Sequence, residues 1–269
     1  MNSTSLNQTN TNATRSPKPA FSQLSHTYFL EALTDLLKTF RSPGFVLPSL
    51  LFPVMFYMFF GVLFVPSDNP DVPKYLLATY AVFGVMGPAL FSFGANVAVE
   101  KDRGMLALKQ ISPMPIAAYF VAKVLTSMSF AVLIIALLFT VAIALAGVTM
   151  PLWQWITTFL VLIPGVLPFC AIGLFIGLKV KADAAPAVVN LIYLPMSFLS
   201  GLWIPVMQFP EMLQKAAMVL PPFHFSQLVL KIQGADIGIA TLIHVMVLLA
   251  YALFFGALAH RTFKTMQIK

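Results

Sequence analysis

Charged side chains are scarce in this sequence. Only 9% of its 269 residues are Asp, Glu, Lys or Arg, whereas 59% are hydrophobic. A soluble globular domain has about 25% charged residues, because its surface faces water. The composition therefore excludes an ordinary soluble domain and predicts an integral membrane protein.

Cysteine is nearly absent as well. The one cysteine, Cys170, lies within a hydrophobic run. A single cysteine cannot form a disulfide within the chain, so we expect Cys170 to be a small packing residue.

Hydrophobic runs, by contrast, are long and repeated. A helix needs about 20 apolar residues to cross the hydrocarbon core of a membrane, and six runs approach or exceed that length. They cover residues 45–65, 75–99, 118–146, 153–178, 186–204 and 237–259. We therefore predict an all-α protein with six transmembrane helices. Pro164 and Pro168 interrupt the fourth run, and Gly173 and Gly177 would permit close helix approach there.

Acidic residues are missing from the interiors of all six runs. Gradient-driven carriers and intramembrane hydrolases place ionisable groups at depth, where each is costly and is retained for a purpose. Only Lys123, close to the start of a run, and His244 come near, and we interpret His244 as a hydrogen-bonding packing residue. The absence argues against two alternatives, a secondary carrier and a membrane-embedded enzyme acting on lipids.

Motifs for catalysis and for nucleotide binding are also missing. The sequence has no His-Glu-x-x-His, no Gly-x-Ser-x-Gly and no Gly-x-x-x-x-Gly-Lys phosphate loop. If the protein moves a solute, the energy must enter from another subunit through a cytoplasmic surface.

Basic residues are distributed unevenly along the chain. With the N-terminus inside, thirteen of the sixteen Lys and Arg residues fall on the cytoplasmic side, and only Lys74, Lys215 and Lys231 fall outside. Cytoplasmic loops carry such an excess, so we predict that both termini are cytoplasmic. The same bias explains the net charge of +7, and no nucleic-acid partner is needed.

Two segments precede the first span. Residues 1–20 are polar and low in complexity, which predicts a disordered cytoplasmic tail. Residues 21–41 place Phe29, Leu33, Leu37 and Phe40 at helical spacing. This pattern predicts an amphipathic helix along the inner membrane surface, with packing on the protein itself as the alternative.

The connection over residues 100–117 carries a burst of charge. Four charged residues, from Glu100 to Arg103, are followed by Gly104, which can adopt the positive φ that reverses a chain. Residues 105–111 then read as a short amphipathic helix ended by Ser112 and Pro113. Such a helix can dock into a groove on a soluble partner; the alternative is that the charges only anchor a helix end at the lipid headgroups.

The order of these residues resembles the cytoplasmic loop of ABC-2 type transporter permeases, which reads acidic-x-acidic-x-Gly-Thr-Leu and then Pro. The match covers Glu100, Asp102, Gly104, Leu106 and Pro113, whereas Met105 stands where the family has Thr. A second block, residues 199–205 followed by a proline-divided segment over 205–236, is similar to the family's fifth span and its re-entrant extracellular helices.

The resemblance covers residues 21–269 and implies a permease in the plasma membrane. Its partners would be a second permease copy or homologue, membrane lipid, and a separate cytoplasmic ATPase that binds ATP and Mg²⁺, with no cofactor in this chain. The coupling helix of this family contacts the ATPase, which assigns that role here to Glu100, Lys101, Asp102, Arg103, Gly104, Leu106, Leu108 and Ile111.

Spans one, two and five border the transport pathway in related permeases. The corresponding candidates here are Phe56, Tyr57, Tyr80, Asn190, Tyr193 and Phe198, with Asn190 and Tyr193 foremost because a polar group in a span needs a partner. An aromatic lining favours export of a hydrophobic or amphipathic molecule such as a drug or a lipid. The alternatives are a polysaccharide or lipopolysaccharide exporter of the same family, and an ABC-associated structural or immunity subunit that does not transport.

Overall fold

A computed structural model describes residues 21–65, 71–112 and 114–267, and within these ranges the chain is helical, with no β-strand. The predicted tail over residues 1–20 lies outside the described residues. The elements, in chain order, are α1 (Phe21–Phe40), α2 (Pro43–Met58), the π-helical η1 (Phe59–Leu63), α3 (Asp71–Asp102), α4 (Met105–Ile111), α5 (Ile116–Ala144), α6 (Leu152–Leu162), the 3₁₀ turn η2 (Pro164–Val166), α7 (Leu167–Lys179), α8 (Ala185–Leu199), η3 (Val206–Gln208), α9 (Glu211–Ala217), α10 (Pro221–Gln233) and α11 (Thr241–Gln267).

Five helices of the described chain are long and apolar enough to span a membrane. They cover Pro43–Leu63, Asp71–Asp102, Ile116–Ala144, Leu152–Lys179 and Thr241–Met266, and each matches one of the predicted spans. The sixth prediction, a span over 186–204, is not confirmed at full length. Its helix, α8, has 15 residues, or about 22 Å at 1.5 Å per residue, against roughly 30 Å of hydrocarbon. It ends where Gly201 turns the chain with a φ of 77°.

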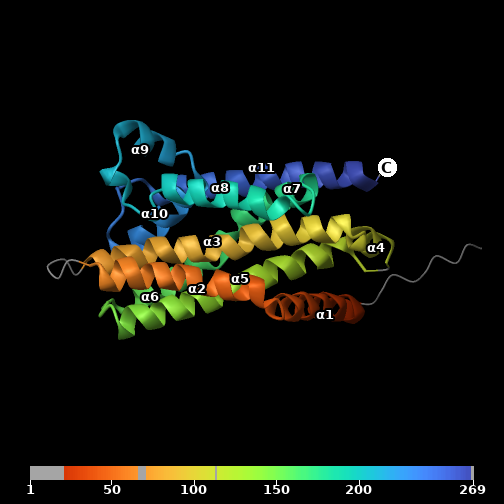
Figure 1. Ribbon diagram of the computed structural model, residues 1–269, viewed down its shortest axis with the longest axis horizontal. Helices are drawn as coiled ribbons and strands as arrows, with labels where there is room; N and C mark the ends of the chain where they lie inside the picture. Colours follow the sequence, from red (N-terminus) through yellow and green to blue (C-terminus); the bar gives the residue numbers. More distant parts are fainter. Residues whose placement is uncertain (1–20, 66–70, 113, 268–269) are drawn as a thin grey trace, which may run out of the picture.

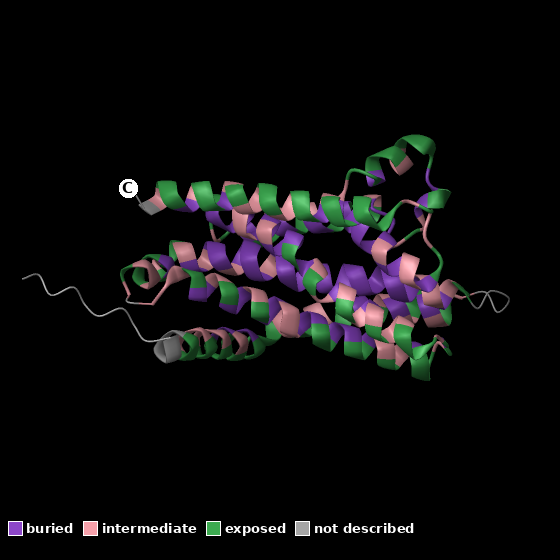
Figure 2. Cartoon of the chain, turned by 180° about the vertical axis from the view of Figure 1, so that it is seen from behind, coloured by how far each residue is buried: buried purple, intermediate pink, exposed green. Residues whose placement is uncertain are grey.

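Helix α3 forms the centre of the bundle, as its buried surface in Figure 2 shows. Its tightest neighbour is α7, whose Gly173 and Gly177 face the α3 backbone. A Cβ atom added at Gly177 would lie 2.3 Å from the carbonyl oxygen of Phe93, and one at Gly173 would lie 2.8 Å from that of Leu90. The predicted close approach at these glycines is therefore confirmed, and α3 is the helix they approach.

The predicted interruption of the fourth span is also confirmed. Helices α6 and α7 are joined through η2, which begins at Pro164. A Cβ atom at Gly165 would lie 2.0 Å from the Phe225 ring of α10. The break in the span therefore leaves space that an aromatic side chain of another element fills.

Helix α10 packs back into the bundle beside α3, α6 and α11, at the end of the molecule opposite α1 and α4 (Figure 1). Its His224 is joined to His244 of α11 by a 2.9 Å contact between the two Nδ1 atoms, and His224 Nε2 lies 2.7 Å from the carbonyl oxygen of Met218. Because a carbonyl only accepts, His224 Nε2 carries hydrogen, and its Nδ1 accepts from His244. His244 is thus a buried packing residue, paired with a second histidine that the sequence does not reveal as its neighbour.

Helix α1 packs along the first half of α5 with its polar side inward. Asp35 and Thr39 of α1 are buried, whereas Phe29, Leu33 and Leu37 are 40% to 64% exposed. Phe40 stacks on Phe130 of α5 at 4.9 Å between ring centroids. From Phe29 to Leu37, the apolar stripe predicted from the sequence therefore faces away from the protein, and Phe40 packs against α5.

Candidate coupling loop and substrate pocket

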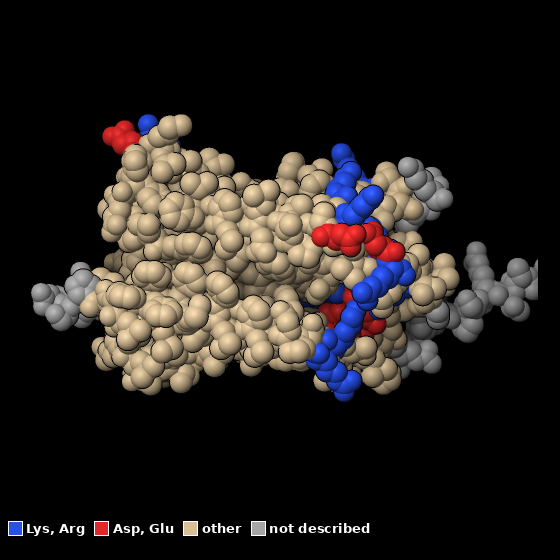
Figure 3. Space-filling model, viewed as in Figure 1, with Lys and Arg blue, Asp and Glu red and all other residues tan. Residues whose placement is uncertain are grey.

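Charged side chains gather in one band at the end of the molecule formed by α1 and α4, as Figure 3 shows for one face. Between this band and the small acidic and basic cluster at the opposite end, that face carries neither sign of charge. The band holds the predicted coupling segment, whose charged side chains contact several neighbouring helices.

Glu100 lies at the centre of a buried ionic cluster. Only 4% of the residue is exposed, and its carboxylate accepts hydrogen bonds from Lys38 of α1 and from the Tyr119 hydroxyl of α5. Lys123 of α5 lies 3.3 Å from Glu100 and 3.1 Å from Asp35 of α1. The cluster therefore ties the end of α3 to both α1 and α5, and Glu100 points into the protein.

Lys101 and Asp102 hold the opposite side of the same helix end. The Lys101 ammonium group donates to the carbonyl oxygens of Gly177, Leu178 and Val180, the last at 2.6 Å. These carbonyls lie at the C-terminal end of α7, where the helix dipole also stabilises a cation. Asp102 accepts a 2.7 Å hydrogen bond from the backbone N–H of Ala182, just before α8. The end of α3 is thus fastened to the α7–α8 connection.

Helix α4 begins directly after this anchored segment. Gly104 has a φ of 73° and turns the chain from α3 into α4, as the sequence predicts. Leu106 is buried in the core, whereas Leu108 and Ile111 are 64% and 83% exposed. Residues three apart share a face of a helix, so Leu108 and Ile111 together form an exposed apolar face, which we call the α4 face.

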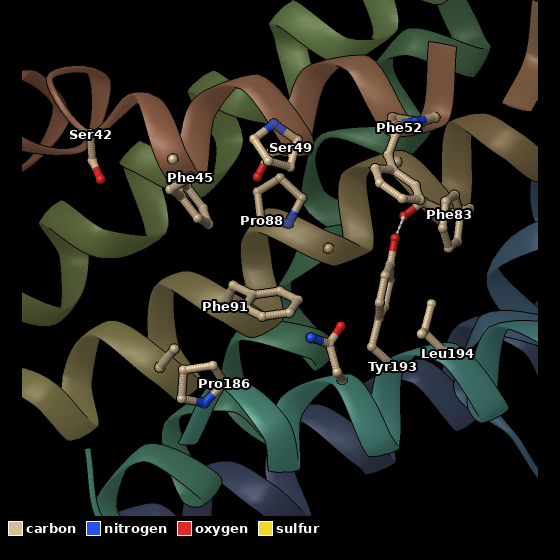
Figure 4. A pocket seen from close by; sticks show the side chains of 17 residues that line it. Ser42, Phe45, Ser49, Phe52, Phe83, Pro88, Phe91, Pro186, Tyr193 and Leu194 are labelled. Carbon is tan, nitrogen blue, oxygen red and sulfur yellow. Dashed lines mark hydrogen bonds between the residues drawn. The ribbon is translucent and has the colours of Figure 1, made fainter. Parts of the chain in front are cut away.

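A cavity of about 560 Å³ lies between α2, α3 and α8. We call it the aromatic groove, since Phe45, Phe52, Phe83, Phe91 and Tyr193 line it together with prolines, small residues and Asn190. Figure 4 shows Tyr193 pointing from α8 toward α3, where its hydroxyl donates to the carbonyl oxygen of Phe83 at 3.0 Å. This bond leaves the groove with an apolar, aromatic wall.

The six predicted pathway residues separate into two groups. Asn190 and Tyr193 line the groove. Phe56, Tyr57, Tyr80 and Phe198 do not: Phe56 packs against Tyr80 and Trp203, and the Tyr57 hydroxyl donates to the Pro73 carbonyl. Three groove aromatics, Phe52, Phe83 and Phe91, lie on the same spans one and two, and apolar character alone cannot distinguish them from their packing neighbours.

Four members of the ionic cluster were not predicted as site residues from the sequence. Asp35, Lys38, Tyr119 and Lys123 lie 19 to 65 positions from Glu100 along the chain. The one available signal was Lys123, a cation near the start of a hydrophobic run. Among the residues the structure describes, no three His, Cys, Asp or Glu side chains come close enough together to hold a metal ion.

Comparison with known proteins identifies the family of this chain. The sequence model of the family described as "ABC-2 type transporter" matches residues 31–233, which is most of the chain. This chain belongs to the ABC-2 type transporter family. A relative from Bacillus subtilis (strain 168), named "Putative transport permease YvfS", is 28% identical over 232 residues, covering 85% of this chain and 94% of that protein. The chain is therefore an ABC-2 family transport permease, a multi-pass membrane protein.

Proposed function

We propose that this permease exports a hydrophobic or amphipathic molecule and that a separate ATPase, docked on the α4 face, supplies the energy. The observation that carries the proposal is the position of α4. Its outer side is apolar and exposed, and the chain before it is fastened by Glu100, Lys101 and Asp102 to α1, α5 and the α7–α8 connection. A push on α4 would therefore reach several helices as one rigid-body movement.

The predicted coupling residues take different parts in this proposal. Leu108 and Ile111 would contact the ATPase, since they are exposed. Glu100, Lys101 and Asp102 would transmit the motion through their bonds inside the permease, and Leu106 would anchor α4 in the core. Gly104 supplies the turn that orients it.

The aromatic groove supports the class of cargo. A binding cavity lined by aromatic and apolar side chains with few polar groups suits a hydrophobic solute. A polysaccharide would need a wide, hydrated conduit, and the side chains of the groove offer few partners for sugar hydroxyls.

The proposal also places the protein in its membrane. The band with α1 and α4 would face the cytoplasm, and the apolar side of α1, from Phe29 to Leu37, would contact lipid. Helix α10 would be a re-entrant element at the outer side. A second permease copy or homologue would complete the transporter.

Co-purification tests the docking step. Tagged permease is solubilised gently from its native membranes, and the soluble proteins that accompany it are identified by mass spectrometry. We expect an ATP-binding cassette ATPase with the wild-type chain and its loss with the double variant Leu108→Asp, Ile111→Asp. Met212→Asp is the matched control, because Met212 is 82% exposed on α9 at the other end. Recovery of the ATPase with the double variant, or its absence from the wild type, would contradict the proposal.

A further inference from the structure

A second cavity adjoins the aromatic groove at the charged end. It has a volume of about 210 Å³ and is lined by residues of the ionic cluster together with Asn96, Arg103 and Met105. We call it the charged pocket. Ser42 and Phe45 line both cavities, so the two adjoin at these residues, one with an apolar lining and the other with a polar one.

One face of α3 forms a common wall to both cavities. Gly84, Pro88, Phe91 and Ala95 line the groove, and Val99 and Arg103 continue the row into the charged pocket at helical spacing. From Gly84 to Arg103 this wall is roughly 30 Å long at 1.5 Å per residue. End to end, the two cavities are thus long enough for a molecule with an extended apolar chain and a separate polar head.

The charges of the charged pocket are balanced except for one. Lys38 pairs with Glu100, and Lys123 pairs with both Glu100 and Asp35. Arg103 is the fifth charged residue of the lining, and within the described part of the chain its guanidinium group has no ion-pair or hydrogen-bond partner. The pocket therefore carries one uncompensated positive charge.

Two further polar groups in the lining of the charged pocket are unengaged. The Asn96 amide and the Ser42 hydroxyl line the pocket, and neither has a side-chain hydrogen bond to any residue that the structure describes. Together with the planar guanidinium of Arg103, they form a set of donors suited to oxygen atoms of an anion. Phosphate, sulfonate and carboxylate share this chemistry.

We propose that the adjoining cavities bind an amphiphile with an anionic head, which is the cargo of the permease. The head lies against Arg103, Asn96 and Ser42, and the apolar chain lies along the aromatic groove toward Phe83 and Tyr193. This inference rests on the proposed transport function and narrows its substrate class. Amphiphiles of equal chain length bind more weakly when their head is neutral, because they lack the charge-assisted contact with Arg103, or cationic, because Arg103 repels them.

Direct binding to the purified permease tests the charge preference without an ATPase. Three probes with the same chain, dodecyl phosphate, dodecanol and dodecyltrimethylammonium, are titrated in a neutral detergent and counted as adducts by native mass spectrometry. We expect dodecyl phosphate to bind about ten-fold tighter than dodecanol, because one charge-assisted contact is worth roughly that factor. Equal affinities, or a preference for the cation, would overturn the proposal.

Variants locate the two halves of the site. Arg103→Gln removes the preference for phosphate, whereas Arg261→Gln, an exposed arginine in α11 that does not line the pocket, leaves it unchanged. Asn190→Trp, at the exposed rim of the groove, weakens binding of all three probes. A phosphate preference that survives Arg103→Gln would show that the head binds elsewhere.

The complex with its ATPase tests the role as cargo. Dodecyl phosphate is expected to raise the rate of ATP hydrolysis by the wild-type complex and to do so less with Asn190→Trp. Binding without stimulation would identify a resident lipid and overturn the assignment as cargo. The co-purification experiment shows separately whether the proposed transport function itself fails, since no ATPase would then accompany the wild-type chain.

Discussion

Lys123 shows how a single residue can join three helices. Its side chain is 2% exposed and its ammonium group lies between the carboxylates of Asp35 and Glu100. Buried charges are tolerated only when they are paired and hydrogen-bonded, and here Thr126 adds a 2.9 Å hydrogen bond to Asp35. Removing the cation therefore leaves a carboxylate buried without its compensating charge.

We expect Lys123→Met to lower the free energy of unfolding by about 3 kcal/mol, the scale found when one partner of a buried pair is removed. Thermal or denaturant unfolding in detergent measures the change. Lys38→Met is the matched control, since the Lys38 side chain is 54% exposed and should contribute about 1 kcal/mol or less. Asp35→Asn in the Lys123→Met background should restore part of the loss. Equal effects of the two lysine variants would contradict the burial argument.

Between elements, close backbone approach decides how α3 and α7 pack. Small residues on α7 leave room for α3 carbonyl groups where any side chain would collide. In α10 and α11, by contrast, two histidines form the connection through a shared hydrogen bond. The contact between α3 and α7 thus depends on the shape of the two helices, and the contact between α10 and α11 depends on the protonation of the histidines.

Gly177→Ala is expected to destabilise the bundle by about 1–3 kcal/mol, the usual cost of overpacking, because its Cβ would meet backbone atoms that cannot rotate away. The melting temperature in detergent reports the change. Gly256→Ala in α11 is the control, since a Cβ there meets nothing within 4 Å, and it should leave the melting temperature unchanged or raised. The reverse order of the two variants would show that α3 and α7 are not in this contact.

The histidine pair predicts a pH dependence of stability. Burial lowers the pKa of His224 from its ordinary value of 6.5, opposed in part by its hydrogen bond to Met218. At low pH the unfolded chain therefore binds a proton at His224 more readily than the folded chain does. The free energy of unfolding is then unaffected by His224 above about pH 6.5 and declines as the pH falls below that value. Lys231 and Asp236, the charged groups that act on His244, pair with each other.

Melting temperatures from pH 7.5 to pH 5.5 test this prediction. The wild type should lose stability over this range, and His224→Gln, which cannot be protonated, should lose less. His260→Gln in α11 controls for removing a histidine elsewhere, since no side-chain bond of His260 occurs in the described chain. A decline of the same size in all three proteins would assign the effect to other groups.

For the whole molecule, charge is segregated along the long axis, with a charged band at one end and a small cluster at the other (Figure 3). The orientation that we propose turns the band, and with it the excess of Lys and Arg, to the cytoplasm. The long helices run between the two ends (Figure 1).

Cysteine labelling tests this orientation. Native Cys170 is buried, so the wild-type chain gives a low background with a membrane-impermeant maleimide. Met212→Cys and Ile111→Cys place matched reporters at opposite ends, since the two positions are 82% and 83% exposed. In intact cells, Met212→Cys should react, and Ile111→Cys should react only after detergent solubilisation. The opposite result would invert the topology.

Local features of the fold were predictable from the sequence because they depend on residues close together in the chain. The length of the hydrophobic runs identified five spans. Pro164 indicated the interruption of one of them, and Gly104 indicated the turn before α4. Gly173 and Gly177 indicated a close helix contact without its partner. Asn190 and Tyr193, which line the groove, were among the pathway residues predicted through the family resemblance, whereas apolar character could not separate the aromatics that line the groove from those that pack elsewhere.

Tertiary structure alone decided where the charged residues point. The sequence by itself determined that this is a helical membrane protein that resembles the ABC-2 type permeases, with a burst of charge between its second and third spans. It could not determine that Glu100 turns inward to Lys38 and Lys123, that Lys101 ends α7, or that His224 meets His244. These pairs are 20 to 79 positions apart, and such partners become neighbours only when helix packing brings them together.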